Sequence, residues 1–257
     1  MWPVQGDTSA RDESRHSEGL YRLCRAEGNK NPHPIVVTGE FRMRSANQIQ
    51  DRFLCDACES GFDRQGEDWV MRHCYRGKQK FLLPDMLLKE KPLLSDEATS
   101  VYAGAKVKDL DVAALTYFPV SVFWRAAARE WNMRGYKMPP IELGSYEEEL
   151  RLFLLGKGEF PKNASLTVWV STKEVPLLVA HFPMSERTEN ARIHRFYIPG
   201  IQFMLALSKQ LDESQRKGCI VHGRDNPIWM SGEVETVIKK RFRDWLQEHE
   251  AKAKGNV

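Results

Sequence analysis

Two cysteines, Cys55 and Cys58, are separated by two residues, a spacing that lets both thiolates bind one metal ion. Upstream, Cys24 is preceded at the same spacing by Tyr21, where the first cysteine of a second pair would stand. A structural zinc site has four ligands. We therefore predict a zinc site on Cys24, Cys55 and Cys58. The candidates for the fourth ligand are Cys74, His73 and a water molecule. The alternative is that the thiols are free and packed in a small core.

The number and placement of the cysteines favour metal binding over disulfide formation. The chain has five cysteines, and four of them lie between residues 24 and 74. An odd number without a secretion signal argues against a disulfide framework. We therefore expect a reduced, cytoplasmic setting.

Three further side chains have the types that phosphodiester hydrolysis requires. His33 precedes the strand-like run Ile35 to Val37, and Glu59 and Glu67 follow the cysteine pair. A helix that begins near Cys58 places the two glutamates about two turns apart, on roughly one side. In such an arrangement a histidine deprotonates water, and a carboxylate holds a divalent ion, Mg²⁺ or Mn²⁺, on the scissile phosphate. The alternatives are a surface loop histidine and, for Glu59, a charge that favours the helix dipole.

The charge balance alone does not define a partner. Net charge is +3, from 38 basic and 35 acidic residues, which is too even to predict nucleic-acid binding. Two basic clusters stand out, and we interpret both as solvated faces. The first contains Arg72, Arg76, Lys78 and Lys80, and the second contains Lys239, Lys240, Arg241 and Arg243. No apolar run approaches the roughly 20 residues that span a bilayer, so we expect no membrane segment.

The chain divides into three regions by composition. Residues 1–18 are polar and are expected to form a flexible tail rather than a signal peptide. Residues 19–92 are rich in cysteine, histidine, glycine and charge, and residues 93–257 alternate helical and strand-like patterns. This order predicts an α+β fold, in which a small ββα zinc-knuckle unit is followed by a larger body of helices and sheet.

The expected elements of the body follow from hydrophobic spacing. The helices are 111–134, interrupted near Pro119, then one that begins at Ser145 with a capping box, and 232–248. The strands are 166–170, 177–182, 194–198, 201–207 and 219–222, with a turn at Pro199-Gly200. Within the first helix Arg125 follows Trp124 in an apolar stretch. A buried arginine needs an acidic partner, and we expect Glu130 or one of Glu147 to Glu149.

The ordered series of motifs resembles a family of uncharacterised bacterial proteins related to HNH endonucleases. The matching motifs are Tyr21-Arg-Leu-Cys24, His33-Pro-Ile-Val, Phe53-Leu-Cys55-Asp-Ala-Cys58-Glu59, Phe62 with Glu67, Ser121-Val-Phe-Trp124-Arg125 and Ile141-Glu-Leu-Gly144. The resemblance covers residues 19 to about 160. It implies a metal-dependent DNA endonuclease, acting in defence against foreign DNA, with His33 as the general base and Glu59 near the metal.

The sequence also departs from the family pattern. Tyr21 replaces the first zinc ligand, Pro34 comes directly after His33, and no second histidine follows Cys58 in the expected register. A nuclease that lacks a metal ligand loses most of its activity. The alternative is therefore a catalytically inactive zinc-knuckle module that binds nucleic acid or a partner protein. A third possibility is an interaction protein in which the larger α+β body carries the function.

Overall fold

The computed structural model describes residues 10–14, 24, 33, 35–37, 42–44, 50–77, 80–133, 136–174 and 176–255. Most of the predicted tail, Tyr21, Pro34 and Lys78 lie outside these residues. Among the described helices, none is long and apolar enough to cross a membrane.

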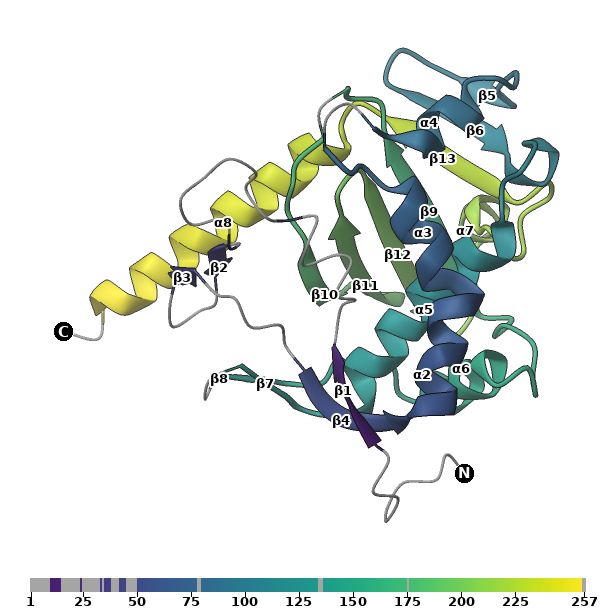
Figure 1. Cartoon of the computed structure of the whole chain (residues 1–257). Helices are drawn as coiled ribbons and strands as arrows, with labels where there is room; N and C mark the ends of the chain where they lie inside the picture. The colour runs from purple at the N-terminus through teal and green to yellow at the C-terminus, as the bar shows by residue number, and fades with distance from the viewer. Residues whose placement is uncertain are drawn as a thin grey trace.

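A mixed sheet of seven strands forms the centre of the molecule, which confirms the α+β class (Figure 1). The strand order is β10-β11-β12-β9-β13-β6-β5, with β9 and β13 parallel and the other neighbours antiparallel. The strands are β5 (Leu94–Ser95), β6 (Thr99–Ala103), β9 (Ala164–Ser171), β10 (His181–Arg187), β11 (Ala191–Ile198), β12 (Ile201–Ser208) and β13 (Pro227–Ser231).

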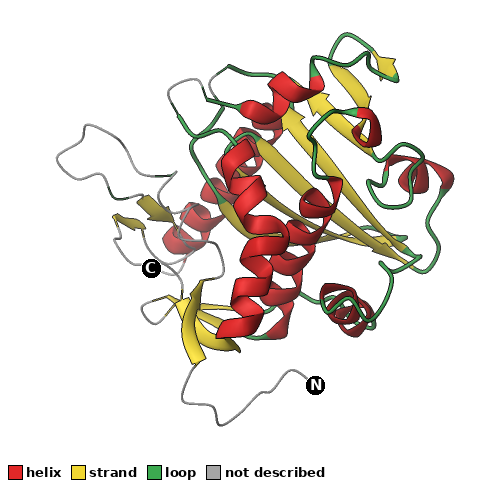
Figure 2. Ribbon diagram, turned by 45° about the vertical axis from the view of Figure 1, so that its right-hand side comes forward, coloured by secondary structure: helices red, strands yellow, loops and turns green. Residues whose placement is uncertain are grey.

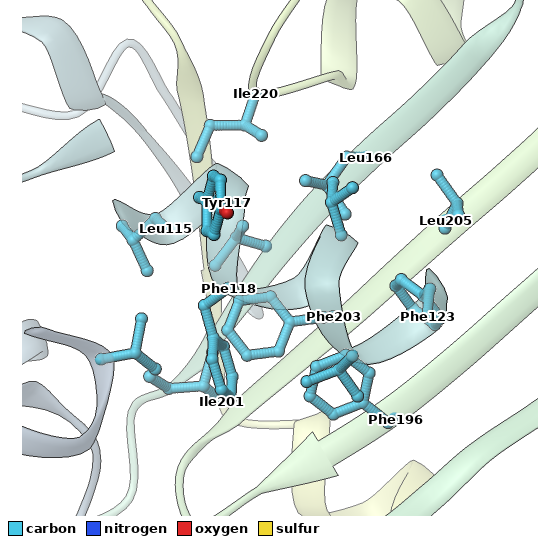
Figure 3. Packing of buried hydrophobic residues seen from close by; sticks show 14 of the residues in the cluster. Leu115, Tyr117, Phe118, Phe123, Leu166, Phe196, Ile201, Phe203, Leu205 and Ile220 are labelled. Carbon is cyan, nitrogen blue, oxygen red and sulfur yellow. The ribbon is translucent and has the colours of Figure 1, made fainter. Parts of the chain in front are cut away.

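Helix α5 (Val112–Ala128) packs on one face of this sheet and is buried along most of its length. Its Phe118 ring meets the rings of Phe196 and Phe203 edge-on, at centroid distances of 6.0 and 5.7 Å (Figure 3). Phe123 contacts Phe196 in the same way, at 5.1 Å. Each buried aromatic side chain removes a large apolar area from water. These contacts fix α5 against β11 and β12.

A second helical stretch runs beside α5 over the same face of the sheet (Figure 2). It consists of α2 (Asp56–Phe62), a five-residue π-helical segment η1 (Asp63–Glu67) and α3 (Asp68–His73). Gly66 lies against the backbone of Phe118 in α5. Leu54, Phe62 and Val70 belong to the same hydrophobic core as the sheet. The division expected after residue 92 therefore does not separate two cores among the described residues.

The opposite face of the sheet supports the long C-terminal helix α8 (Val234–Gly255). Because neighbouring residues of a strand face opposite sides, Phe196 points to α5 while Tyr197 points to α8. Val234 and Ile238 of α8 pack with Tyr197. The carboxylate of Glu235, in the first turn of α8, accepts hydrogen bonds from Ser171 Oγ (2.7 Å) and Tyr197 Oη (3.3 Å). The start of α8 is thus attached to the end of β9 and to β11.

Shorter elements complete the fold. The remaining strands form three two-stranded antiparallel sheets: β1 (Ala10–Ser14) with β4 (Gln50–Cys55), β2 (Ile35–Val37) with β3 (Arg42–Arg44), and β7 (Trp131–Met133) with β8 (Tyr136–Met138). The remaining helices are α4 (Leu82–Leu87), the 3-10 turn η2 (Gly104–Lys106), α6 (Tyr146–Leu154) and α7 (Glu213–Gly218). Strand β4 leads directly into α2, so the cysteine pair lies at a strand-to-helix junction.

Several predicted elements are confirmed and others are wrong. The strands around Pro199-Gly200 are present as β11 and β12, and the C-terminal helix is present as α8. Helix α5 continues through Pro119 without a break. The predicted strand 219–222 is a turn, and the apolar run 177–182 enters a strand only at His181.

Candidate functional site

The two thiols of the predicted zinc motif lie next to each other. Cys55 ends β4 and Cys58 lies in the first turn of α2, with their Sγ atoms hydrogen-bonded at 3.3 Å. Both residues are half-buried, and Cys58 packs against the main core. The hydrogen bond with Cys58 lowers the pKa of Cys55 below that of an ordinary thiol. The pair is therefore a local site with one thiol more acidic than usual.

The two other candidate ligands lie elsewhere. Cys74 follows the end of α3, at the far end of the helical stretch that Cys58 begins (Figure 1). At a rise of 1.5 Å per residue this separation is roughly 20 Å. The charge of Cys24 acts on Cys74 and on Tyr197, so Cys24 lies at that end too. Burial raises the pKa of Cys24 and of Cys74 to about 12.

The described residues therefore do not fit a zinc site of four thiols. One zinc ion binds its cysteine ligands at about 2.3 Å, and a helix of this length keeps Cys58 and Cys74 much farther apart. Among the described residues, no three His, Cys, Asp or Glu side chains form a group that could hold a metal ion. His73 does not supply the missing ligand, because it lies beside Cys74 and its ring stacks on Trp69 at 3.8 Å.

Glu67 takes part in a buried ion pair. Its Oε2 atom is 3.6 Å from Nη2 of Arg125, and the two side chains are 13% and 5% exposed. The Arg125 guanidinium also lies over the ring of Phe62, 5.5 Å from its centroid. The partner expected for Arg125 was Glu130 or one of Glu147 to Glu149, and this expectation is wrong. Glu130 instead pairs with Lys137 at 3.0 Å.

The environment of Glu67 favours charge compensation rather than metal binding. Asp63, one turn earlier, has a pKa raised by burial and by the nearby Asp68, and lowered in part by Arg125. Arg125 therefore interacts with both carboxylates on the inner side of the helical stretch. A glutamate that neutralises a buried guanidinium is poorly placed to give up its charge to a divalent ion.

His33 and Glu59 are both described, and both are half-buried. Glu59 lies in the first turn of α2, as the cysteine motif predicts. The strand after His33 places Val36 against Trp131 and Met138 of the β7–β8 hairpin, and against Phe182. The structure thus positions the His33 segment beside that hairpin. The general-base role of His33 stays a prediction.

A basic groove lies between the edge strand β10 and helix α8. It has a volume of about 540 Å³. Its lining residues are Met184, Ser185, Glu186, Arg195, Val237, Lys240, Arg241 and Asp244. Arg195 and Arg241 both bond to the same oxygen, Oε2 of Glu186. Two guanidinium groups share one carboxylate, so the pair leaves a net positive charge at the groove.

No family model, no curated protein and no solved structure matches this chain. The resemblance to HNH-related proteins therefore stays a prediction.

Sequence reasoning found only half of the groove. The cluster from Lys239 to Arg243 was evident from the sequence, and we interpreted it as a solvated face. Arg195 and Glu186 carried no signal of their own, because ordinary alternation in a strand gives the same pattern. Their contact with α8 depends on how that helix returns across the sheet.

Proposed function

We propose that this protein binds nucleic acid through the basic groove between β10 and α8. The observation that carries the proposal is the shared contact of Arg195 and Arg241 with Glu186, with Lys240 lining the same groove. Phosphate contacts from lysine and arginine supply most of the affinity in sequence-independent nucleic-acid binding. Guanidinium groups suit phosphate because they present donors in a fixed planar fork.

The helix side of the groove extends this positive surface. The segment from Val237 to Arg243 contains four cations and no acid. Lys239, Lys240, Arg241 and Arg243 are all exposed. Phe242 stands among them and is 50% exposed. Aromatic side chains between cations provide surfaces on which unpaired bases stack, which favours single-stranded nucleic acid as a ligand.

The groove has a rigid basis on both sides. Lys240 and Arg241 lie less than two turns after Glu235, whose buried carboxylate is held by Ser171 and Tyr197. Arg195 belongs to β11, which is paired with strands on both sides. Cations on rigid elements lose less entropy on binding than cations on loops. This arrangement supports binding by a preformed surface.

The test compares two double variants that each remove two exposed cations. Lys240→Gln with Arg241→Gln changes the groove, whereas Arg216→Gln with Lys217→Gln changes α7 and serves as the matched control. Binding of a fluorescent single strand and of the corresponding duplex is measured by anisotropy. We expect the groove variant to lose affinity by roughly tenfold or more, because two phosphate contacts are lost. Equal affinity of the wild type and the groove variant would refute the proposal.

Hydrolysis of the bound nucleic acid, with His33 and Glu59 in the roles that the resemblance implies, stays a prediction. Its test is nicking of supercoiled plasmid in the presence of Mg²⁺ or Mn²⁺. If His33 is the general base, His33→Ala lowers nicking by about 100-fold or more while binding to the groove is kept. Equal nicking by wild type and His33→Ala would remove His33 from the chemistry.

A further inference from the structure

We propose that Cys55 and Cys58 form a thiol–disulfide exchange site that reacts with external disulfides, with Cys55 as the attacking and Cys58 as the resolving cysteine. This inference begins from the separation of the four thiols. Because Cys74 lies at the other end of the helical stretch and Cys24 acts on Cys74, the pair at the β4–α2 junction stands apart from them. It is independent of the proposed groove.

The distance between the two sulfur atoms supports exchange. Two thiolates on one tetrahedral zinc ion, each about 2.3 Å from the metal, lie about 3.8 Å apart. The Sγ atoms of Cys55 and Cys58 are closer, at 3.3 Å, and are hydrogen-bonded. A disulfide requires about 2.05 Å. The side chains therefore need to move by only a little more than one ångström to close the bond.

The two cysteines differ in their surroundings, which assigns their roles. Cys58 packs against the main hydrophobic core, whereas Cys55 ends an edge-paired strand and does not belong to that core. An incoming disulfide therefore reaches Cys55 first, and Cys58 approaches from the inner side. Cys74 and Cys219 are fully buried and do not compete for the same reactant.

The exchange balances without any other reactant. The Cys55 thiolate attacks one sulfur of an external disulfide, RS–SR, which gives a mixed disulfide and releases one RS⁻. The Cys58 thiolate then attacks the Cys55 sulfur, closes the Cys55–Cys58 disulfide and releases the second RS⁻. The two cysteines lose two electrons and two protons, and the external disulfide becomes two thiols. The reverse sequence reduces the protein.

The first test follows the redox state of the pair in the full chain. The protein, purified under reducing conditions, is equilibrated with mixtures of reduced and oxidised glutathione, quenched in acid, unfolded and alkylated. Trypsin cleaves after Arg52 and Arg64, which leaves Cys55 and Cys58 together in one peptide without another cysteine. We expect this peptide to pass from the doubly alkylated form to the internal disulfide as the mixture becomes more oxidising. A peptide that stays doubly alkylated throughout would overturn the proposal.

The second test assigns the order of attack. Cys58→Ser removes the resolving thiol, so we expect a stable mixed disulfide with glutathione to accumulate on Cys55. Cys55→Ser is expected to form such an adduct roughly tenfold more slowly or less, because the remaining thiol packs against the core. Cys219→Ser is the control and should behave as the wild type. Equal adduct formation by the two serine variants would overturn the assigned roles.

Discussion

At the scale of single residues, the buried ion pair between Arg125 and Glu67 shows what the local sequence determines. The apolar surroundings of Arg125 in its helix predict burial, and burial predicts an acidic partner. Both expectations are confirmed, but the partner was wrong. Glu67 comes from a helical stretch 58 positions earlier in the chain, and only tertiary packing brings the two together.

Loss of the Glu67 charge should therefore destabilise the protein. Glu67→Gln leaves a buried guanidinium without its carboxylate, and we expect a decrease of about 3 kcal/mol in the free energy of unfolding. Replacing both residues, as in Glu67→Gln with Arg125→Met, should recover a large part of this loss. Urea unfolding measures both effects. A loss below about 1 kcal/mol in the single variant would show that the pair contributes little.

His194 gives the protein a pH-dependent stability. Its side chain is fully buried, its Nδ1 atom is hydrogen-bonded to Ser185 Oγ at 2.8 Å, and burial lowers its pKa from 6.5 to about 4. Between these values the unfolded chain binds a proton that the folded chain does not. The contribution of His194 to stability is therefore complete above pH 6.5 and is lost as the pH falls toward 4.

The expected loss for this one group is about 3 kcal/mol between pH 7 and pH 4. Urea unfolding across this range, compared between the wild type and His194→Gln, isolates the contribution. The variant should be less stable at pH 7 and should lose less stability on acidification. Parallel pH curves for the two proteins would show that His194 is not the group responsible.

At the scale of elements, the approach of the helical stretch to α5 depends on a single glycine. A Cβ atom at Gly66 would lie 2.7 Å from the backbone nitrogen of Phe118 and 3.0 Å from its Cα. Backbone atoms in two packed helices have little room to move apart. Gly61, in the same stretch, has no such neighbour, since a Cβ there would meet only the end of the Gln65 side chain at 3.7 Å.

Alanine at the two positions should therefore have opposite effects. Gly66→Ala is expected to decrease the free energy of unfolding by about 1–3 kcal/mol, because the helices must separate. Gly61→Ala is expected to be neutral or to stabilise by up to about 1 kcal/mol, through the better helix propensity of alanine. Thermal and urea unfolding of the pair give the comparison. Similar effects at both positions would contradict the close packing at Gly66.

The elements that sequence reasoning predicted well are those with strong local patterns. The alternation on both sides of Pro199-Gly200 predicted β11 and β12, and Gly200 adopts the positive φ that such a turn requires. The capping box at Ser145 was wrong. The backbone N–H groups of Tyr146 and Glu147 bond instead to the carbonyl groups of Leu143 and Gly144, so the serine side chain is not needed there.

At the scale of the whole molecule, the sequence predicted the α+β class but not the way in which distant segments meet. One sheet carries α5 on one face and α8 on the other, and the order of the seven strands depends on contacts over long sequence distances (Figure 1). The groove exists because α8 crosses beside β10, which a local pattern does not reveal. For the same reason the spacing of the cysteines predicted the pair at residues 55 and 58 but not its separation from Cys74.

The salt dependence of binding tests the central claim of nucleic-acid binding most directly. The affinity of duplex DNA is measured for the wild type, the groove variant and the α7 variant over a series of salt concentrations. For each lost phosphate contact, the slope of log affinity against log salt decreases in magnitude by about 0.9. We predict a slope smaller by about 2 for the groove variant and no change for the α7 variant. The same slope for all three proteins would contradict a binding site between β10 and α8.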